Sequence, residues 1–392
     1  MIKYPKKKLW EICEILLWWT PPRNNNNNFW WVFLWCSIRD MKNKYISNTN
    51  EKLTELWVKN SNVKLLKEWT LFMSFKLSLW KLAFAWKDLY TNEAIAWLPI
   101  KNEKELDINF LYYTLSWYDF SILWTDNSVK WATLNKAKLE VLPIPLPPLP
   151  TQKLIVQKLD SSFEKIDKSI ELTKKNLENI EELNKSVLEE VFREWELVEI
   201  WKLLEKNSNW NPKTIWDNYF EYIDISSIDN KNFILTETKE IKWNEAPSRA
   251  KQLVIKNDII FATTRPNLKN IAIIDLDIKN LTSSTWFCVL RPIKDKLYFK
   301  FLYFYIITDI FLEKLTPLIR WAQYPAISDK DLKSLKIPLP PLQKQKEIVA
   351  HLDQVFLKNK ALKETYQKKL KDLEEMKQSL LKEAFEGRLV KE

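Results

Sequence analysis

The chain carries one proline-rich hexapeptide twice, and this repeat limits the folds open to it more than any other feature. Ile-Pro-Leu-Pro-Pro-Leu occupies residues 144–149 and returns 193 residues later at 337–342. Proline fixes φ and has no N–H to donate, so each copy is predicted to be extended and non-helical. The same spacing relates Leu188 to Leu381. One half of the chain is therefore an internal repeat of the other, with loops of different length.

Each hexapeptide leads into a long segment with a helical heptad pattern. Segments 151–193 and 343–386 place apolar residues alternately three and four positions apart, which is typical of a coiled-coil seam. Two paired helices are favoured over two helices docked separately on their own domains, because neither helix could bury so long a seam alone. The polar Thr173 and Asn184 in this seam are suited to fixing its register. The predicted seam residues are Ile155, Leu159, Ile166, Ile170, Leu177, Ile180, Ile348, Leu352, Leu362, Leu373 and Leu380.

The long segments divide the chain into four parts. We expect a first domain at 1–150, a first helix at 151–195, a second domain at 196–342 and a second helix at 343–392. Short apolar runs mixed with predicted helices at 108–115 and 299–311, and a predicted strand from Asp258, indicate α+β domains. The fold class is therefore α+β, with two similar domains separated by two long helices. Matched helices beside diverged domains indicate a common scaffold that carries two different recognition surfaces.

The charge distribution favours a polyanionic partner. The net charge is +10, but the two helical segments together contribute only +1, so the excess of +9 lies mainly in the domains. Such an excess is typical of nucleic-acid binding, although a solvated surface would also tolerate it. The three cysteines, Cys13, Cys36 and Cys288, form no metal-ligand or disulfide pattern, which fits a reducing cytoplasm. No membrane-spanning run or signal peptide is recognisable, so a cytoplasmic location is expected.

The sequence offers no recognisable catalytic centre. The single histidine, His351, lies within the second long helix, so a hydrolase that uses histidine as its base is not supported. No P-loop is present, and no Asn-Pro-Pro-aromatic stretch of an amino-methyltransferase. Asp258 and Asp275 lack the acid-x-Lys arrangement of a nuclease. We therefore expect a non-catalytic chain with no metal and no cofactor of its own.

The glycine and tryptophan counts are abnormal. The chain has one glycine, Gly387, and 21 tryptophans, whereas glycine is about 7% of an average protein. Several tryptophans stand in turn sequences, where positive φ favours glycine. In the repeat alignment, Trp195 stands opposite Gly387. We infer that most of these tryptophans are glycines in the native protein, encoded by UGA codons that some bacterial lineages read as glycine. The alternative is a protein that is truly rich in tryptophan.

These motifs together resemble the specificity subunit of type I restriction–modification systems. The repeated hexapeptide, followed by a glutamine and by an Ile-Val and Leu-Asp helix, carries the resemblance. Further matches are Leu-Trp-Glu-Ile at 9–12, Trp-Thr-Pro at 19–21, Thr-Thr-Arg-Pro at 263–266 and Lys-Glu-Ala-Phe-Glu-Gly-Arg-Leu at 382–389. The resemblance covers essentially the whole chain. Its departure is the Trp-for-Gly pattern, which affects the expected conformation of loops.

The resemblance implies a fold, partners and a division of labour. In that family, two target-recognition domains lie at opposite ends of an antiparallel coiled coil, and each reads half of a split DNA sequence. The subunit docks two methyltransferase (modification) subunits that carry out DNA methylation with S-adenosylmethionine. Restriction subunits that use ATP and Mg join them. Double-stranded DNA is thus the expected ligand of this chain, and the target base would be flipped into the methyltransferase.

Basic and polar side chains on domain loops are the candidates for DNA contact. Lysine and arginine neutralise phosphates, whereas Arg, Asn and Gln read base edges in the groove. For any one residue, a solvated surface role is the alternative. The candidates are Arg23, Arg39, Lys42, Asn43, Lys44 and Lys76 in the first domain, and Lys213, Arg249, Arg265, Asn267, Lys269, Arg320, Gln323 and Tyr324 in the second.

Two other functions remain open from the sequence. A structural coiled-coil adaptor that binds only proteins would share the helices, and retention of DNA at moderate salt separates it from a DNA-reading subunit. The recognition portion of a fused restriction–modification enzyme would share the domains, but the absence of catalytic motifs counts against it. The DNA target itself is not readable from one chain, and sequencing the methylated bases of the host genome would supply it.

The glycine hypothesis makes a prediction about the native protein. Intact-mass and peptide mass analysis should find glycine where the sequence has tryptophan, because the repeat alignment implies glycine at these positions. Trp30 and Trp35 are outside the predicted set and serve as internal controls. Tryptophan at the predicted sites would contradict the hypothesis. These sites are Trp10, Trp19, Trp195, Trp201, Trp210 and Trp321.

Overall fold

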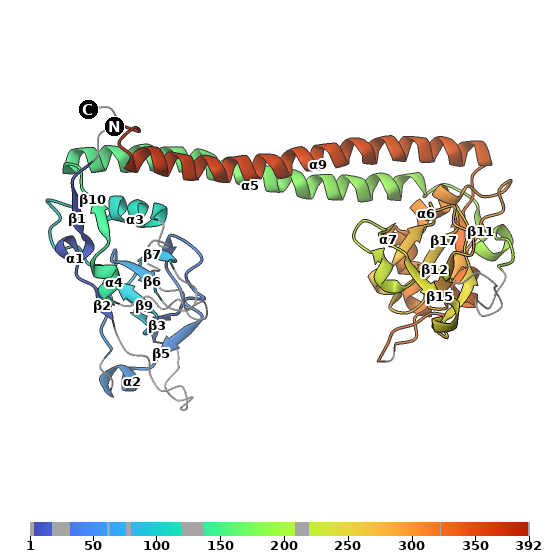
Figure 1. The fold of residues 1–392 in the computed structure, drawn as a ribbon, viewed down its shortest axis with the longest axis horizontal. Helices are drawn as coiled ribbons and strands as arrows, with labels where there is room; N and C mark the ends of the chain where they lie inside the picture. Colours follow the sequence, from blue (N-terminus) through green and yellow to red (C-terminus); the bar gives the residue numbers. More distant parts are fainter. Residues whose placement is uncertain are drawn as a thin grey trace. The chain divides into compact units, whose positions relative to one another are not determined.

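The computed structural model describes residues 4–17, 32–60, 63–75, 80–118, 136–207, 219–321 and 323–390. These form two compact units. Unit 1 comprises Met1–Thr173 with Lys368–Glu392, and unit 2 comprises Lys174–Gln367. Two long helices, α5 (Leu149–Val191) and α9 (Leu342–Phe385), contribute to both units (Figure 1). Among the described residues, none of the helices combines the length and the apolar character that a membrane span requires.

Both proline hexapeptides are extended, as predicted. The first begins within β10 (Pro143–Pro145), which pairs antiparallel with β1 (Lys6–Lys8). The second begins within β21 (Lys336–Pro338), which pairs antiparallel with β11 (Leu197–Glu199). The long helices begin directly after the prolines, at the last residue of each hexapeptide. Each unit therefore closes with a two-stranded ribbon that passes straight into a helix.

Unit 1 is an α+β domain built on two sheets. A five-stranded sheet has the order β2-β9-β6-β7-β4, and a three-stranded sheet has the order β5-β3-β8. The predicted helix at 108–115 is present as α3 and runs two residues further. The remaining elements are α1 (Leu9–Ile12), β2 (Leu16–Leu17), β3 (Phe33–Cys36), β4 (Tyr45–Ile46), β5 (Glu51–Leu53), α2 (Glu55–Asn60), β6 (Leu71–Ser74), β7 (Leu82–Ala85), β8 (Tyr90–Thr91), β9 (Ile95–Trp97), α3 (Ile108–Trp117) and α4 (Lys136–Glu140).

Unit 2 has sheets of order β15-β12-β19-β16, β18-β17-β20 and β13-β14. The predicted helix at 299–311 is in fact two helices, because Thr308 leaves the helix and caps α7 through its hydroxyl. The elements are β12 (Tyr219–Ile223), β13 (Ile228–Asp229), β14 (Ile234–Leu235), β15 (Lys239–Lys242), β16 (Ala250–Leu253), β17 (Ile259–Ala262), β18 (Ile271–Ile273), β19 (Thr282–Ser284), β20 (Phe287–Leu290), α6 (Phe299–Ile306), α7 (Asp309–Leu315) and α8 (Asp329–Ser334), with short 3-10 helices η3 (Ile200–Leu203), η5 (Ile225–Ser227), η6 (Trp243–Glu245), η7 (Pro266–Leu268) and η8 (Thr316–Leu318).

The two units share a core plan. In unit 1, β6 lies between antiparallel β7 and β9; in unit 2, β17 lies between antiparallel β18 and β20. The end of a long helix completes each core. Phe385 of α9 packs its ring 5.5 Å from Phe110 in unit 1, and Phe192, just after α5, lies 5.3 Å from Phe301 in unit 2. Each core therefore combines residues of one half of the chain with a helix end from elsewhere in the sequence.

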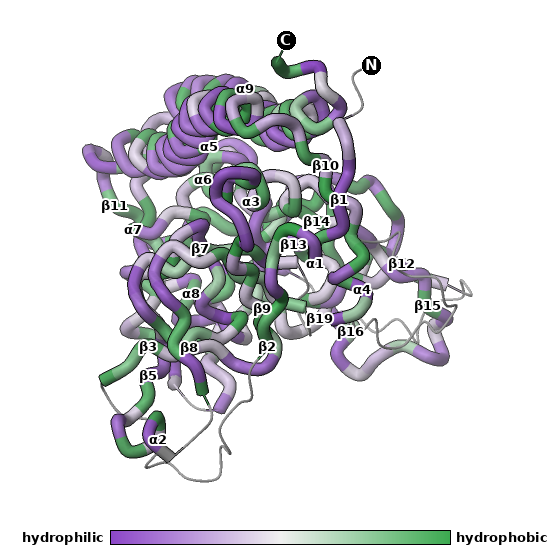
Figure 2. The backbone as a smooth tube through the Cα atoms, turned by 90° about the vertical axis from the view of Figure 1, so that its left-hand side faces the viewer, coloured by the Kyte–Doolittle hydropathy of each residue, from purple (hydrophilic) through white to green (hydrophobic). Residues whose placement is uncertain are grey.

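The long helices pair antiparallel within each unit, where α5 and α9 lie side by side (Figure 1). Asn359 donates to Asn184 at 2.7 Å in unit 2, and Lys377 donates to Asp167 in unit 1. The tube in Figure 2 shows apolar residues interrupting a mostly polar surface along both helices. Thr173 is buried, but its hydroxyl bonds to Ser169 of its own helix, so it contributes no cross-helix bond.

One predicted seam residue is wrong. Leu362 is 41% exposed, and the neighbouring Lys363 instead faces α5, where its amino group lies 3.0 Å from Glu181. A lysine can cover a seam with its aliphatic stem while its charge meets a carboxylate, which an apolar pattern does not reveal. Ile155, Leu159, Ile166, Ile180, Ile348 and Leu352 are buried, whereas Ile170, Leu177, Leu373 and Leu380 are half-buried.

A buried glutamine at the start of each long helix makes the same three hydrogen bonds. Gln152 donates to the carbonyls of Glu105 and Pro147, both at 2.8 Å, and accepts from the Asp107 N–H at 2.9 Å. Both glutamines are fully buried. In unit 2, Gln345 bonds in the same way to the Lys296 and Pro340 carbonyls and to the Tyr298 N–H. The carboxamide thus ties the proline segment, the helix and the domain together.

Backbone conformation bears on the glycine hypothesis. Trp69 and Trp80 have positive φ angles of 64° and 70°. At the turn that corresponds to Trp69, the second unit has Asn257 with φ 72°; these N–H groups bond to the Ala85 and Ile274 carbonyls at matching places. Glycine and asparagine adopt this conformation readily, whereas tryptophan does so at a cost. We therefore add positions 69 and 80 to the proposed glycines.

The tryptophans that were proposed as glycines from the sequence differ from Trp69 and Trp80 in backbone conformation. Trp10, Trp201 and Trp321 are 48%, 55% and 64% exposed, and Trp195 donates its indole N–H to Val191, but none of them has positive φ. Trp35 is buried, which suits a genuine tryptophan. Trp19, Trp30 and Trp210 lie outside the described residues. Exposure of large indoles is compatible with glycine at these sites but does not require it.

The glutamine contacts generate a stability prediction. Replacing Gln152 by leucine leaves three backbone groups without partners, so the free energy of unfolding of unit 1 should fall by on the order of 3 kcal/mol. Gln157→Leu on the exposed side of the same helix is the matched control and should change stability by less than about 0.5 kcal/mol. Denaturant unfolding followed by circular dichroism measures both variants. Equal losses of unfolding free energy in the two variants would show that the buried carboxamide of Gln152 does not stabilise unit 1.

Candidate nucleic-acid interface

Two loops of unit 2 are joined by backbone hydrogen bonds beside the end of β17. The Arg265 N–H donates to the Pro325 carbonyl at 2.6 Å, and the Ile327 N–H donates to the Thr263 carbonyl at 2.9 Å. Arg320 and Ala326 exchange backbone hydrogen bonds across the second loop. Arg265 itself has left-handed backbone, with φ 52° and ψ 54°. Loops fixed to each other in this way hold their side chains at defined positions.

These two loops bring together most of the second-domain candidates. The Arg265 guanidinium lies 5.3 Å from the centre of the Tyr324 ring, which is 57% exposed. The Arg320 side chain is 79% exposed, with Asp331 at 3.7 Å. Asn267 and Gln323 are exposed on the same pair of loops. Cations, an aromatic ring and amides that face solvent form the set of groups that can contact phosphates and base edges.

A second basic group lies on strand β16 and just before it. Arg249 is exposed, and its guanidinium lies 3.6 Å from the centre of the Trp286 ring. Lys251 is exposed too, whereas Ala250 and Gln252 between and beside them are buried. Sequence reasoning identified Arg249 but missed Lys251. The alternation of basic and small or polar residues in this strand is the signal that could have found it, because alternate residues of a strand share a face.

Lys269 is part of the structure of the domain. Its amino group donates to the Asp309 carboxylate at 2.7 Å and to the Ile307 carbonyl at 3.0 Å. Lys185 of α5 also lies 2.7 Å from Asp309. Hydrogen bonds from Lys185 and then Lys269 hold the pKa of the Asp309 carboxyl below its ordinary value. Lys269 therefore joins the segment before β18 to the start of α7, where Asp309 also pairs with Lys185 of the long helix, and its charge is already matched.

In unit 1, an aspartate organises the loop that carries three candidates. The Asp40 carboxylate accepts from the backbone and hydroxyl of Ser37, both at 2.8 Å, and from the backbone and amide of Asn50, at 2.9 and 2.6 Å. Around this turn Arg39, Lys42 and Asn43 are exposed. The arrangement presents two cations and an amide to solvent from a fixed loop.

Lys44, the next residue, is held inward. Its amino group lies 3.4 Å from both the Tyr113 hydroxyl and the Asp160 carboxylate of α5. It also lies over the ring of Tyr112 at 5.0 Å. Lys44 thus fastens the domain to the long helix. The remaining candidates, Arg23, Lys76 and Lys213, fall outside the described residues.

The groups that are usual in catalysis are not assembled in the described parts of the chain. No cluster of three His, Cys, Asp or Glu that could hold a metal occurs among those residues. His351 is exposed on α9. Burial raises the pKa of the Cys13 thiol to about 12 and also raises the pKa of Cys36 and Cys288, so none of these three is a ready nucleophile.

Known proteins are similar to this chain in part of their sequence. The EcoDI type I restriction enzyme specificity subunit of Escherichia coli is 25% identical over 299 residues, covering 65% of this chain and 64% of that subunit. The MjaVIII specificity subunit of Methanocaldococcus jannaschii is 26% identical over 286 residues, covering 65% of each. The chain therefore matches slightly less than two thirds of the length of these relatives.

Two solved structures show the same fold. A chain from work on complex assembly and conformational transition of the type I R-M system has a TM-score of 0.76 at 20% identity, covering 99% of this chain and all of that one. The HsdS subunit of Thermoanaerobacter tengcongensis has a TM-score of 0.62 at 19% identity, covering 98% and 97%.

The match to a family model agrees with the sequence relatives and with the solved structures. The profile of the type I restriction modification DNA specificity domain matches residues 1–182 and matches again over residues 190–372. These two ranges include nearly all of the chain and fall on the two halves that the hexapeptide repeat relates. The chain therefore belongs to the family of type I restriction–modification DNA specificity proteins.

Proposed function

We propose that this chain is the DNA-specificity subunit of a type I restriction–modification complex. The observation that carries the proposal is the doubled plan, in which each unit presents exposed cations and amides on fixed loops and is completed by the paired helices. Unit 1 offers Arg39 and Lys42, and unit 2 offers Arg265 and Arg320. Two such surfaces on one chain suit a target read in two separate parts. Because the two sets differ, each domain would read a different half-site.

Binding would combine a general and a specific component. Lysines and arginines of the domains neutralise phosphates, which gives affinity that falls as salt rises. Side chains on the two hydrogen-bonded loops of unit 2 then select bases. A guanidinium can pair with guanine and an amide with adenine in the major groove. Arg265 is the best placed, because its backbone is fixed on both sides and the ring of Tyr324 supports its guanidinium.

The chemistry of the complex belongs to other subunits in this proposal. Methyltransferase subunits would dock on the paired helices and would bring S-adenosylmethionine, while restriction subunits would bring ATP and Mg. Leu172, Leu183 and Leu357 are 54%, 49% and 71% exposed on these helices and offer apolar contact area. This chain would contribute recognition and spacing and no catalytic group.

The role of Arg265 is testable by substitution. Arg265→Ala in the complex with the methyltransferase should weaken binding to the cognate target by about 1–3 kcal/mol and relax selectivity in one half-site only. Arg265→Lys retains the charge but not the planar fork, so it should recover affinity more than selectivity. Competition binding against targets with each half scrambled in turn measures both effects.

Arg193→Ala is the control, because Arg193 is exposed at the end of α5 and far in sequence from the loops. It should leave half-site selectivity unchanged. If scrambling either half never alters binding of the unsubstituted complex, this chain does not recognise DNA sequence. Failure to retain DNA at moderate salt would favour a protein-binding adaptor instead.

The helix pair is proposed to set the spacer between half-sites. A helix of 43 residues is about 65 Å long at ~1.5 Å per residue. The hydrogen bond between Asn184 and Asn359 places Leu177, seven residues before Asn184, opposite Tyr366, seven residues after Asn359, in the antiparallel register. Insertion of one heptad after Leu177 and another after Tyr366 keeps the seam in phase and adds ~10 Å. Methylome sequencing should then find a spacer longer by roughly three base pairs, at ~3.4 Å per base pair, with both half-sites unchanged.

A single insertion is the matched control. A heptad added to one helix alone shifts the partner's register, so it should disrupt pairing and lower activity broadly. An active double-insertion complex that keeps the original spacer would show that the helices do not measure it.

A further inference from the structure

One loop of unit 1, residues 37–44, is fixed at both ends. The Asp40 carboxylate holds its first half with four hydrogen bonds. At its last residue, the Lys44 carbonyl accepts from the Phe84 N–H at 2.7 Å. The Lys44 amino group lies 3.4 Å from the Asp160 carboxylate of α5. Exposed candidates for DNA contact lie between these anchors, and the second anchor is on a long helix.

The Lys44 amino group is surrounded by tyrosines. It lies 3.4 Å from the Tyr113 hydroxyl, which itself donates to the Asp160 carboxylate. The ring centres of Tyr45, Tyr112 and Tyr113 lie 5.6, 5.0 and 4.8 Å from it. At these distances the face of an aromatic ring attracts a cation. The side chain is only 25% exposed, so water screens these contacts in part.

Unit 2 has the same elements at the corresponding place. Residues 109–113 of α3 read Asn-Phe-Leu-Tyr-Tyr, and residues 300–304 of α6 read Lys-Phe-Leu-Tyr-Phe, each run starting at the second residue of its helix. Asp160 and Asp353 are each the twelfth residue of their long helix. Strand β14 lies beside β18 as β4 lies beside β7. The elements around Lys44 therefore all have counterparts in unit 2.

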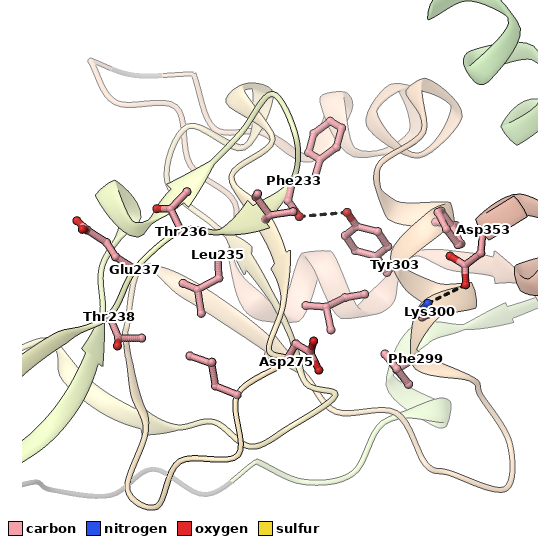
Figure 3. A pocket seen from close by; sticks show the side chains of 14 residues that line it. Phe233, Leu235, Thr236, Glu237, Thr238, Asp275, Phe299, Lys300, Tyr303 and Asp353 are labelled. Atoms are coloured by element: carbon pink, nitrogen blue, oxygen red, sulfur yellow. Dashed lines mark hydrogen bonds and ion pairs between the residues drawn. The ribbon is translucent and has the colours of Figure 1, made fainter. Parts of the chain in front are cut away.

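The cation that pairs with the second aspartate comes from a different element. Lys300 of α6 pairs with Asp353 of α9 at 2.7 Å (Figure 3). The segment at β14 is held through its backbone, because the Tyr303 hydroxyl donates to the Phe233 carbonyl at 3.1 Å (Figure 3). Both units thus pair a helix aspartate with a lysine, but only in unit 1 does that lysine belong to a loop.

A cavity of about 670 Å³ in unit 2 marks the place that Lys44 occupies in unit 1 (Figure 3). Three groups surround the Lys44 amino group, and the counterparts of all three line this cavity: Tyr303 for Tyr112, Phe304 for Tyr113 and Asp353 for Asp160. The phenylalanine has no hydroxyl, so the group that accompanies Lys44 is missing where no loop lysine arrives. The loop anchor is therefore a feature of unit 1.

We propose that Lys44 is a positioning residue for sequence recognition by unit 1. It holds the loop of residues 37–44 on α5, so that Lys42 and Asn43 keep fixed positions toward DNA. This role rests on the proposed function. Discrimination of a base depends on paired hydrogen bonds of defined geometry, whereas attraction to phosphates tolerates a mobile charge. Loss of the anchor therefore lowers selectivity more than affinity.

Lys44→Met removes the cation and keeps a long side chain. In the complex with the methyltransferase, the half-site of unit 1 is the one that Arg265→Ala leaves unaffected. Selectivity is the ratio of the dissociation constants for the target with that half scrambled and for the cognate target. Competition binding should show this ratio falling at least about tenfold. The affinity for fully scrambled DNA should change by less than about threefold, because the exposed cations remain.

Lys300→Met is the matched control. It removes the cation from Asp353, but the segment at β14 keeps its bond from Tyr303. The selectivity for either half-site should therefore change by less than about threefold, since a partly exposed ion pair contributes little by itself. Lys44→Arg retains a cation of similar reach, so it should preserve selectivity in unit 1.

A double variant separates the anchor from the ion pair. Asn109 stands at the position of Lys300, so Asn109→Lys in the Lys44→Met chain gives Asp160 a cation from α3. Denaturant unfolding should show recovery of the stability that the single variant loses. Selectivity for the half-site of unit 1 should stay low, because the loop is still not tied to α5.

Full selectivity in the Lys44→Met complex would overturn this role of Lys44. Recovery of selectivity together with stability in the double variant would also overturn it, since a cation on Asp160 would then suffice from any element. Circular dichroism checks folding, and the double variant supplies the test if the single variant does not fold. A complex of the unsubstituted chain that ignores both half-sites would instead contradict the proposed function itself.

Discussion

A buried carboxamide at the base of each long helix holds the architecture together. Gln152 and Gln345 satisfy backbone groups at the first turn of a domain helix and at the preceding proline segment, where no regular secondary structure supplies partners. Prolines have no N–H to donate, so a sharp turn of the backbone at these segments requires hydrogen bonds from another group. One side chain thereby sets the direction in which a helix of more than 40 residues leaves its domain.

The helices in turn complete the domains. A solitary helix of this composition would not hold its shape in water, because most helical stability in proteins comes from packing. Here the end of α9 inserts Phe385 beside Phe110, and the residues after α5 insert Phe192 beside Phe301. Each core therefore requires pairing of segments that are distant in sequence. The candidate side chains Arg265 and Arg320 are exposed and take no part in these aromatic contacts, so they can vary while the scaffold is kept.

Charge alone is a poor guide to the interface. In the sequence, Lys44 and Lys269 were candidates for DNA contact in the same way as Arg39 and Arg265. In the structure, the amino group of each of these lysines is paired with a carboxylate at the join between a domain and a long helix. Arg265 and Arg320, which are more than fifty residues apart, share one pair of loops because backbone bonds connect them through residues 325 and 326. Only spatial proximity separates a structural cation from one that is available to a ligand.

The sequence by itself determined the repeat, the extended proline segments, the α+β class of each domain, the long helices and the family, because these depend on local rules of φ, periodicity and motif spacing. The tertiary structure decided the rest. It left Leu362 exposed, paired Lys363 with Glu181 of the other helix, and split the helix predicted at 299–311 at Thr308. These outcomes depend on which distant groups satisfy one another's hydrogen bonds and charges, and a linear pattern does not contain that information.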